Sequence, residues 1–194
     1  MIRPMNKRDA IGALVAGAGL PFAALSQPAK SLKGPALLTV TGAITRTNRG
    51  PMDPVLDLMM AKQKLAFQKA HAFDFAALSA MPSIRLRPTL EYDKRRHELQ
   101  GPLLTTVLQA AGATGRQLAL RAVDGYAPVL SVADAGKYRF IIATHLDGQP
   151  MPLGGLGPLW AVYEPDAFPD MAAKPLDQRF AQCPWALFHI EVQA

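Results

Sequence analysis

The sequence contains a single cysteine, Cys183, which excludes an internal disulfide framework. It is also poor in aromatic residues, at 7% of 194, whereas it contains 17 prolines and 15 glycines. This composition disfavours a bundle of long helices and favours many short elements joined by turns. The length is that of one domain with a short appendage.

The sequence also lacks a strong charge imbalance and the common metal-binding spacings. The formal net charge is +6, and 18 basic against 14 acidic residues remain without residues 1–26. The basic residues form no long run, so no nucleic-acid partner is expected. The four histidines have no H-x-x-x-H or H-E-x-x-H spacing, and no G-x-S-x-G motif occurs. We therefore expect no zinc site and assign no catalytic residue.

Residues 1–26 have the pattern of a signal peptide. Arg3, Lys7 and Arg8 precede an apolar run of about 16 residues that ends in Ala24-Leu25-Ser26, an A-x-S cleavage site. The run is shorter than the roughly 20 apolar residues of a membrane-spanning helix. Export to the periplasm with cleavage near Ser26 is therefore predicted. Lys7-Arg8 resembles a twin-arginine signal with lysine in the first position, while the ordinary secretory route stays open.

After a linker at 27–35, one domain is expected over 36–194. Apolar or alternating runs predict strands over 36–44, 84–87, 118–123, 129–132, 140–146 and 185–192. Apolar residues at helical intervals predict one or two amphipathic helices between Asp53 and Leu78, in which Met59 and Met60 fill the core. A further helix is expected over 103–111, closed by Gly112.

The order of motifs between Leu99 and Pro165 is more specific than any motif alone. L-Q-G-P-L-L and a helix ending in A-A-G-A are followed by A-V-D-G-Y, a strand with a D-G turn, and G-P-L-W-A-V-Y-E-P. Together they resemble the sulfite-oxidase-type oxidoreductase molybdopterin-binding domain, over residues 38–192. The resemblance implies an α+β fold, a mixed and largely antiparallel β domain with short helices, whose loops surround a pterin.

The resemblance also implies a metal ligand that this sequence lacks. Catalytic members hold molybdenum with a cysteine thiolate that precedes the segment matching Leu99 to Leu104. The corresponding residues, Ser83 to His97, include no cysteine, and Cys183 lies some 80 residues too late. Because a soft thiolate is the ligand type that this family uses, molybdenum is not expected here. Cys183 is predicted to be a buried, inert thiol.

A pterin is a flat heterocycle that needs stacking planes, hydrogen-bonding groups and, in phosphorylated forms, positive charge. Arg85 and Arg87 share one side of a predicted strand, and Tyr92 and His97 follow closely. Asp124 and Tyr126 could stand at a loop mouth, although a plain hairpin turn explains Asp124-Gly125 almost as well. The loop with Gly155 and Gly157 offers unobstructed backbone N–H groups. The candidate cofactor-binding residues are therefore Arg85, Arg87, Tyr92, His97, Asp124, Tyr126, Gly155 and Gly157.

Three functions from different classes fit these features. The favoured hypothesis is an exported, non-catalytic or regulatory module that binds a pterin or molybdopterin-like ligand and acts on a membrane-bound signalling or redox partner. The first alternative is a periplasmic molybdenum-cofactor-dependent oxidoreductase with a noncysteine ligand set. The second is an interaction domain with an empty pocket.

Overall fold

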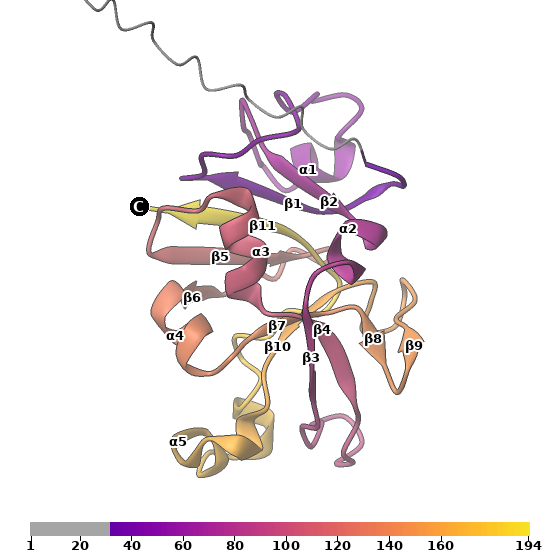
Figure 1. The fold of residues 1–194 in the computed structure, drawn as a ribbon, viewed down its shortest axis with the longest axis vertical. Coiled ribbons are helices and arrows are strands. Elements are labelled where there is room, and N and C mark those ends of the chain that lie inside the picture. The colour runs from indigo at the N-terminus through magenta and orange to yellow at the C-terminus, as the bar shows by residue number, and fades with distance from the viewer. Residues whose placement is uncertain (1–31) are drawn as a thin grey trace, which may run out of the picture.

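A computed structural model describes residues 32–194 as an α+β domain built on three small sheets (Figure 1). The largest sheet has the strand order β2-β1-β11-β5-β6. Strands β1 and β11 are parallel, and the other neighbours are antiparallel. The bounds are β1 Ala36–Gly42, β2 His71–Asp74, β5 Gln117–Ala122, β6 Val129–Ser131 and β11 Leu187–Gln193.

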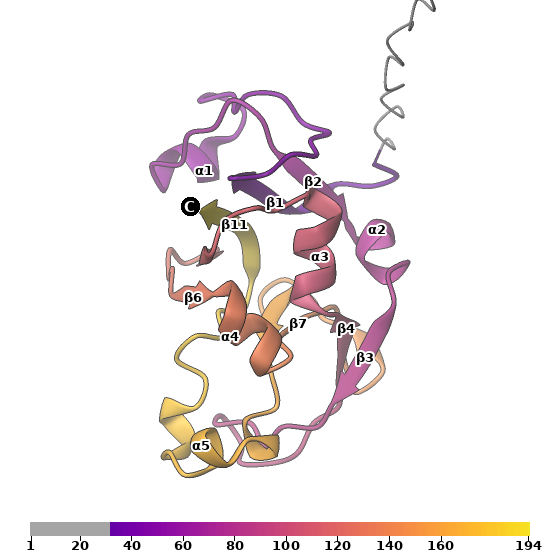
Figure 2. The ribbon, with the colours of Figure 1, turned by 60° about the vertical axis from the view of Figure 1, so that its left-hand side comes forward.

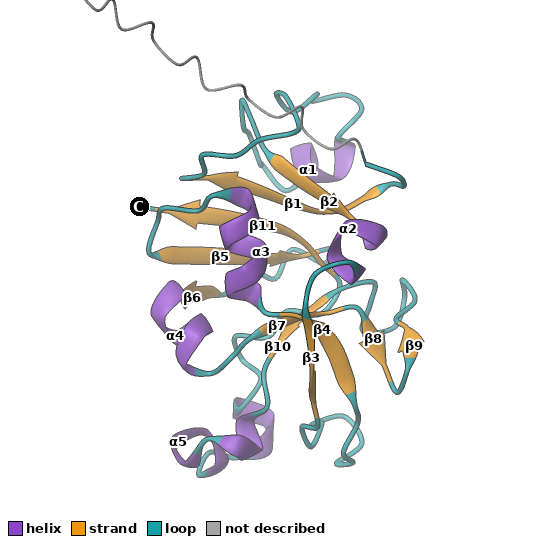
Figure 3. Cartoon of the chain, viewed as in Figure 1, coloured by secondary structure: helices purple, strands orange, loops and turns teal. Residues whose placement is uncertain are grey.

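Two smaller antiparallel sheets lie below the first in Figure 1. Much of the chain between the strands is loop (Figure 3). One of these two sheets has the order β3-β4-β8-β9, formed by Ser83–Leu86, Leu99–Pro102, His145–Leu146 and Gln149–Pro150. The other pairs β7 (Ile141–Ala143) with β10 (Trp160–Val162). The helices are short: α1 Leu58–Lys62, α2 Phe75–Ser79, α3 Leu104–Ala111, α4 Val132–Lys137 and α5 Pro169–Ala172, with 3-10 turns at Pro165–Ala167 and Leu176–Gln178.

The core lies between the large sheet, α3 and the β7–β10 pair. Leu38 and Val40 alternate along β1 and are fully buried on one face of the sheet, as period-2 geometry requires. Helix α3 adds Leu104 and Val107, and Figure 2 shows α3 and α4 packed along the molecule beside the sheet. Trp160 on β10 fills the centre with 1% of its surface exposed. The predicted α3 and its left-handed cap at Gly112 (φ 65°) are confirmed.

Two helices form between Asp53 and Ser79, as predicted, but they are short and most of this segment is not helical. Only α1 and α2 form, and His71–Asp74 between them is strand β2, paired with β1. Asp74 ends the strand because its carboxylate caps α2 by accepting from Ala77 N–H at 2.7 Å. The spacing of apolar residues in a short run fits a helix or a strand, and pairing with β1 selects the strand here.

Two further expectations need correction. Met60 is buried as predicted, whereas Met59 is 42% exposed. The predicted strand over 140–146 is two strands, β7 and β8, which join different sheets because the chain changes partner at Thr144.

The predicted signal peptide, its cleavage near Ser26 and linker residues 27–31 lie outside the described range. Within residues 32–194, no helix is both long and apolar enough to cross a membrane.

Candidate ligand-binding site

Arg85 on β3 and Arg87, which directly follows β3, share one carboxylate. Glu98, directly before the paired strand β4, places Oε1 3.5 Å from Arg85 Nε and Oε2 3.4 Å from Arg87 Nη2. Both arginine side chains are about two-thirds exposed, so these are loose surface ion pairs. Glu98 orients the two guanidinium groups and leaves most of their N–H donors available.

Arg85 also lines a cavity of about 230 Å³, called the hairpin cavity below. Tyr138 and Arg139, which follow α4, and Phe168 also line the cavity. The Tyr138 and Phe168 rings meet edge to face with centroids 5.2 Å apart. The cavity therefore combines two guanidinium groups with aromatic surface. Its complete lining is Ile84, Arg85, Leu86, Tyr138, Arg139, Glu164, Ala167 and Phe168.

The segment after β10 holds the end of β3 in place. Glu164 Oε2 accepts from Arg87 N–H at 3.0 Å, and Asp166 Oδ2 accepts from Thr89 N–H at 2.8 Å. Asp166 is in turn paired with Arg179 at 2.8 Å, with both side chains less than one-fifth exposed. These contacts fix the backbone that carries Arg85 and Arg87, which is what a preformed binding site requires.

His97 directly precedes Glu98 in the same hairpin, and both of its ring nitrogens are occupied. Nδ1 is 2.7 Å from Asp147 Oδ2 and Nε2 is 2.8 Å from Asp93 Oδ2. Hydrogen bonds to these two carboxylates raise the pKa of His97, and the same bonds lower the pKa values of Asp93 and Asp147. The structure thus places His97 in a clamp that ties the hairpin to the β8–β9 turn, and His97 does not line the hairpin cavity.

Tyr92 and Tyr126 come from different loops and meet the same segment, residues 181–185. The Tyr126 hydroxyl donates to the Ala181 carbonyl oxygen. Burial raises the pKa of Tyr92 to about 12, and the Glu91 carboxylate and Cys183 act in the same direction. The two tyrosines therefore lie against residues 181–185, apart from the arginines of the hairpin cavity.

The remaining predicted residues have local structural roles. Asp124 Oδ1 accepts from Tyr126 N–H at 2.9 Å and Gly125 has φ 93°, which is the geometry of a tight turn between β5 and β6. Gly155 N–H donates to the Pro152 carbonyl at 3.3 Å. Gly157 is buried, and a Cβ there would come within 2.5 Å of Met151. The Gly155 N–H is thus used within its own loop.

The residues present do not fit a thiolate-held molybdenum. Cys183 is 4% exposed and lies in the core, as predicted. Burial raises the pKa of its thiol, a backbone hydrogen bond from Tyr163 opposes this, and the Glu91 carboxylate adds to it. The cysteine is thus close to the Ser83–His97 hairpin but enclosed by protein. Residues 32–194 contain no cluster of three histidine, cysteine or acidic side chains with metal-binding geometry.

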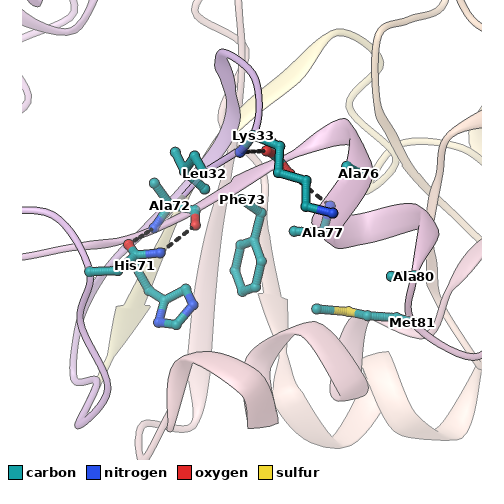
Figure 4. Close-up of a pocket in the computed structure, with 11 residues that line it drawn as sticks. Leu32, Lys33, His71, Ala72, Phe73, Ala76, Ala77, Ala80 and Met81 are labelled. Atoms are coloured by element: carbon teal, nitrogen blue, oxygen red, sulfur yellow. Dashed lines mark hydrogen bonds between the residues drawn. The ribbon is translucent and has the colours of Figure 1, made fainter. Parts of the chain in front are cut away.

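A second, apolar cavity of about 280 Å³ lies between β2, α2 and the first described residues (Figure 4). Its walls are mainly small or apolar, including Phe73, Ala77 and Met81. His71 also lines it, and its Nδ1 lies 3.1 Å from the Arg46 carbonyl, so this nitrogen carries the proton in the neutral ring. Burial lowers the pKa of His71. None of the sequence-predicted site residues reaches this cavity.

Sequence reasoning missed Arg139 and Glu98. Arg139 is 54 positions from Arg85 and follows α4 with φ 55°, which is uncommon for arginine. No spacing in the sequence connects these two residues, because only the tertiary structure places them on the same cavity. Glu98 could have been found from the β3–β4 hairpin, since an acidic residue beside two strand arginines is a common cross-strand pair.

No protein-family model matches the sequence, and no curated protein matches it. Among solved structures, the sulfane dehydrogenase SoxCD from Paracoccus pantotrophus is similar, with a TM-score of 0.51 at 12% sequence identity. The match covers 80% of this chain but only 37% of that chain. An identity this low is evidence on the fold alone. Residues 32–194 have the expected α+β, largely antiparallel architecture, and the fold is sulfite-oxidase-like.

Proposed function

We propose that this domain binds a pterin or a molybdopterin-like molecule at the hairpin cavity, without a molybdenum centre. The observation that carries the proposal is that Arg85 and Arg87 share the Glu98 carboxylate beside a cavity lined by Arg85 and Arg139. Guanidinium groups bind phosphate and stack on flat rings, so they suit both parts of such a ligand.

The size of the cavity limits how the ligand would bind. Pockets that enclose drug-sized ligands have volumes of roughly 300–1,000 Å³, whereas the hairpin cavity has about 230 Å³. It is large enough for one part of the molecule, either the bicyclic ring or the phosphate. The rest of the ligand would extend over the exposed ends of Arg85 and Arg87.

The proposed biological role is that of an exported, non-catalytic module that responds to its ligand and acts on a membrane-bound signalling or redox partner. The signal-peptide pattern of residues 1–26 supports export, and the enclosed Cys183 together with the cysteine-free Ser83–His97 hairpin supports a domain without a thiolate-held metal. We derive no redox step for it.

The test is a fluorescence titration of the exported protein with a pterin phosphate ester and with the same pterin lacking the phosphate. Wild type should bind the ester more tightly. The double variant Arg85→Ala/Arg87→Ala should lose at least about tenfold in affinity, because two charge-assisted hydrogen bonds are removed. Arg116→Ala is the matched control, since Arg116 is exposed and does not line the cavity. It should bind like wild type.

The same preparation, made in a host that produces the cofactor, should be analysed for molybdenum and bound pterin. Pterin without molybdenum would support the proposal. About one molybdenum per chain would instead support an oxidoreductase with a noncysteine ligand set. Undiminished affinity of the double variant would remove Arg85 and Arg87 from the site, and no binding of either pterin would favour an interaction domain.

A further inference from the structure

Four large apolar side chains in α1 and just before it are exposed. Val55 is 75% exposed, Leu56 84%, Leu58 55% and Met59 42%. These four residues are called the α1 patch. Single exposed apolar residues are normal on protein surfaces, but a contiguous group of large ones marks an interaction site.

The turn before α1 fixes the α1 patch, of which Leu56, Leu58 and Met59 also line a cavity of about 320 Å³ against the sheet. Asp53 Oδ1 accepts from Val55 N–H at 2.8 Å and Leu56 N–H at 3.0 Å, which fixes the turn before the helix. Asp57 points inward and forms an ion pair with Arg49 at 2.5 Å. Met60 is 8% exposed and anchors the helix on the sheet. The apolar side chains are therefore displayed by a fixed turn.

The charge around the α1 patch is mainly positive. Lys62, Lys64 and Lys69 follow it in the sequence and are all exposed. Of the two acidic residues of the segment, Asp57 is neutralised by Arg49, which leaves Asp53 as the one exposed carboxylate between Asp53 and Lys69. Exposed apolar side chains flanked by lysines are the combination that binds an anionic lipid surface.

We propose that the α1 patch docks on the surface of an anionic phospholipid bilayer. The apolar side chains enter the boundary between head groups and acyl chains, while the three lysines contact the lipid phosphates. The position of the patch fits this orientation, since α1 and the first described residues lie at the same end of the molecule (Figures 1 and 2). Helix α5 lies at the opposite end.

The experiment uses an environment-sensitive fluorophore on a cysteine at position 56. Cys183 is the sole native cysteine and is buried, so a thiol reagent will label Leu56→Cys in the folded full chain. Ala173→Cys, at the exposed end of α5, is the control label. Each protein is titrated with phosphatidylcholine vesicles that either contain or lack phosphatidylglycerol. This readout reports insertion of the patch itself, whatever residues 1–31 contribute to binding.

The emission at position 56 should shift to the blue with phosphatidylglycerol vesicles, and the emission at position 173 should not. Adding Lys62→Gln, Lys64→Gln and Lys69→Gln should raise the lipid concentration at half-shift by at least about tenfold, because each lysine contributes separately near an anionic surface. An unchanged emission at position 56 would overturn the proposal and leave the patch to a protein partner. An emission shift of the same size without phosphatidylglycerol, or one that the three lysine substitutions do not change, would overturn the proposed contact between the lysines and the lipid phosphates.

Discussion

His189 and Arg121 lie directly opposite each other on β11 and β5, and each has a buried nitrogen that meets no hydrogen-bonding partner within residues 32–194. These atoms are His189 Nδ1 and Arg121 Nε. The other ring nitrogen of His189 is 2.9 Å from Thr41 Oγ1 on β1. The outer face of the large sheet is therefore polar beneath the α1 segment, and a charge on His189 would be costly there.

The stability of the protein should fall in mild acid because of His189. Burial, with Arg121 and Arg49 adding to it, lowers the pKa of His189 to about 4, whereas the ordinary value is 6.5. Between these values the unfolded chain binds a proton that the native state excludes, so stability is lost as the pH falls from 6.5 to 4. The loss is about 1.4 kcal/mol per pH unit, or about 3 kcal/mol in total.

Urea unfolding of wild type and His189→Gln between pH 7 and pH 4 measures this effect. The glutamine variant cannot take up the proton, so its free energy of unfolding should depend less steeply on pH in this interval. Equal slopes in the two proteins would show that another group is responsible.

His97 should have the opposite pH dependence. Its pKa is raised from 6.5 by the carboxylates of Asp147 and Asp93, so the native state holds the proton more tightly than the unfolded chain. The protonated His97 therefore stabilises the folded state fully below pH 6.5, and this stabilisation is lost as the pH rises through the elevated pKa of His97. The difference in melting temperature between wild type and His97→Gln should therefore shrink from pH 6 to pH 9. A difference that is constant across this range would contradict the charged clamp.

Glu98→Gln should strengthen anion binding at the hairpin cavity. The carboxylate lies within 3.5 Å of both Arg85 and Arg87 and competes with an anionic ligand for them. An exposed ion pair contributes about 0.5–1 kcal/mol, so removing the Glu98 charge should make the binding free energy of the pterin phosphate ester more favourable by that amount. This corresponds to roughly a two- to fivefold gain in affinity. Weaker binding in the same titration would instead mean that Glu98 mainly orients the arginines.

Gly101→Ala should destabilise the domain. A Cβ at Gly101 would lie 1.9 Å from the Ile142 carbonyl oxygen and 2.9 Å from Ala143 Cα, so β4 and β7 would have to separate. We expect a loss of at least about 2 kcal/mol in the free energy of unfolding, since backbone cannot yield as a side chain does. Gly155→Ala is the control, because its nearest neighbour would be 3.7 Å away. Similar stability of the two variants would refute the close contact.

The sequence determined most of the local structure. The alternation of Leu38 and Val40 with threonines specified β1, and the apolar run over 103–111 with Gly112 specified α3 and its cap. These features depend only on neighbours in the chain, through side-chain period and backbone freedom. The motif order from Leu99 to Pro165 further indicated the sulfite-oxidase-like fold, through its resemblance to a known family.

The tertiary structure alone decided which side chains meet. It made His71–Asp74 a strand by pairing it with β1, and it brought Arg139 to Arg85 across 54 positions. It also divided the predicted site residues among the hairpin cavity, the His97 clamp and the contacts of the two tyrosines with residues 181–185. The physical reason is that sheet pairing and burial are long-range: they depend on surfaces that do not exist until the strands have assembled.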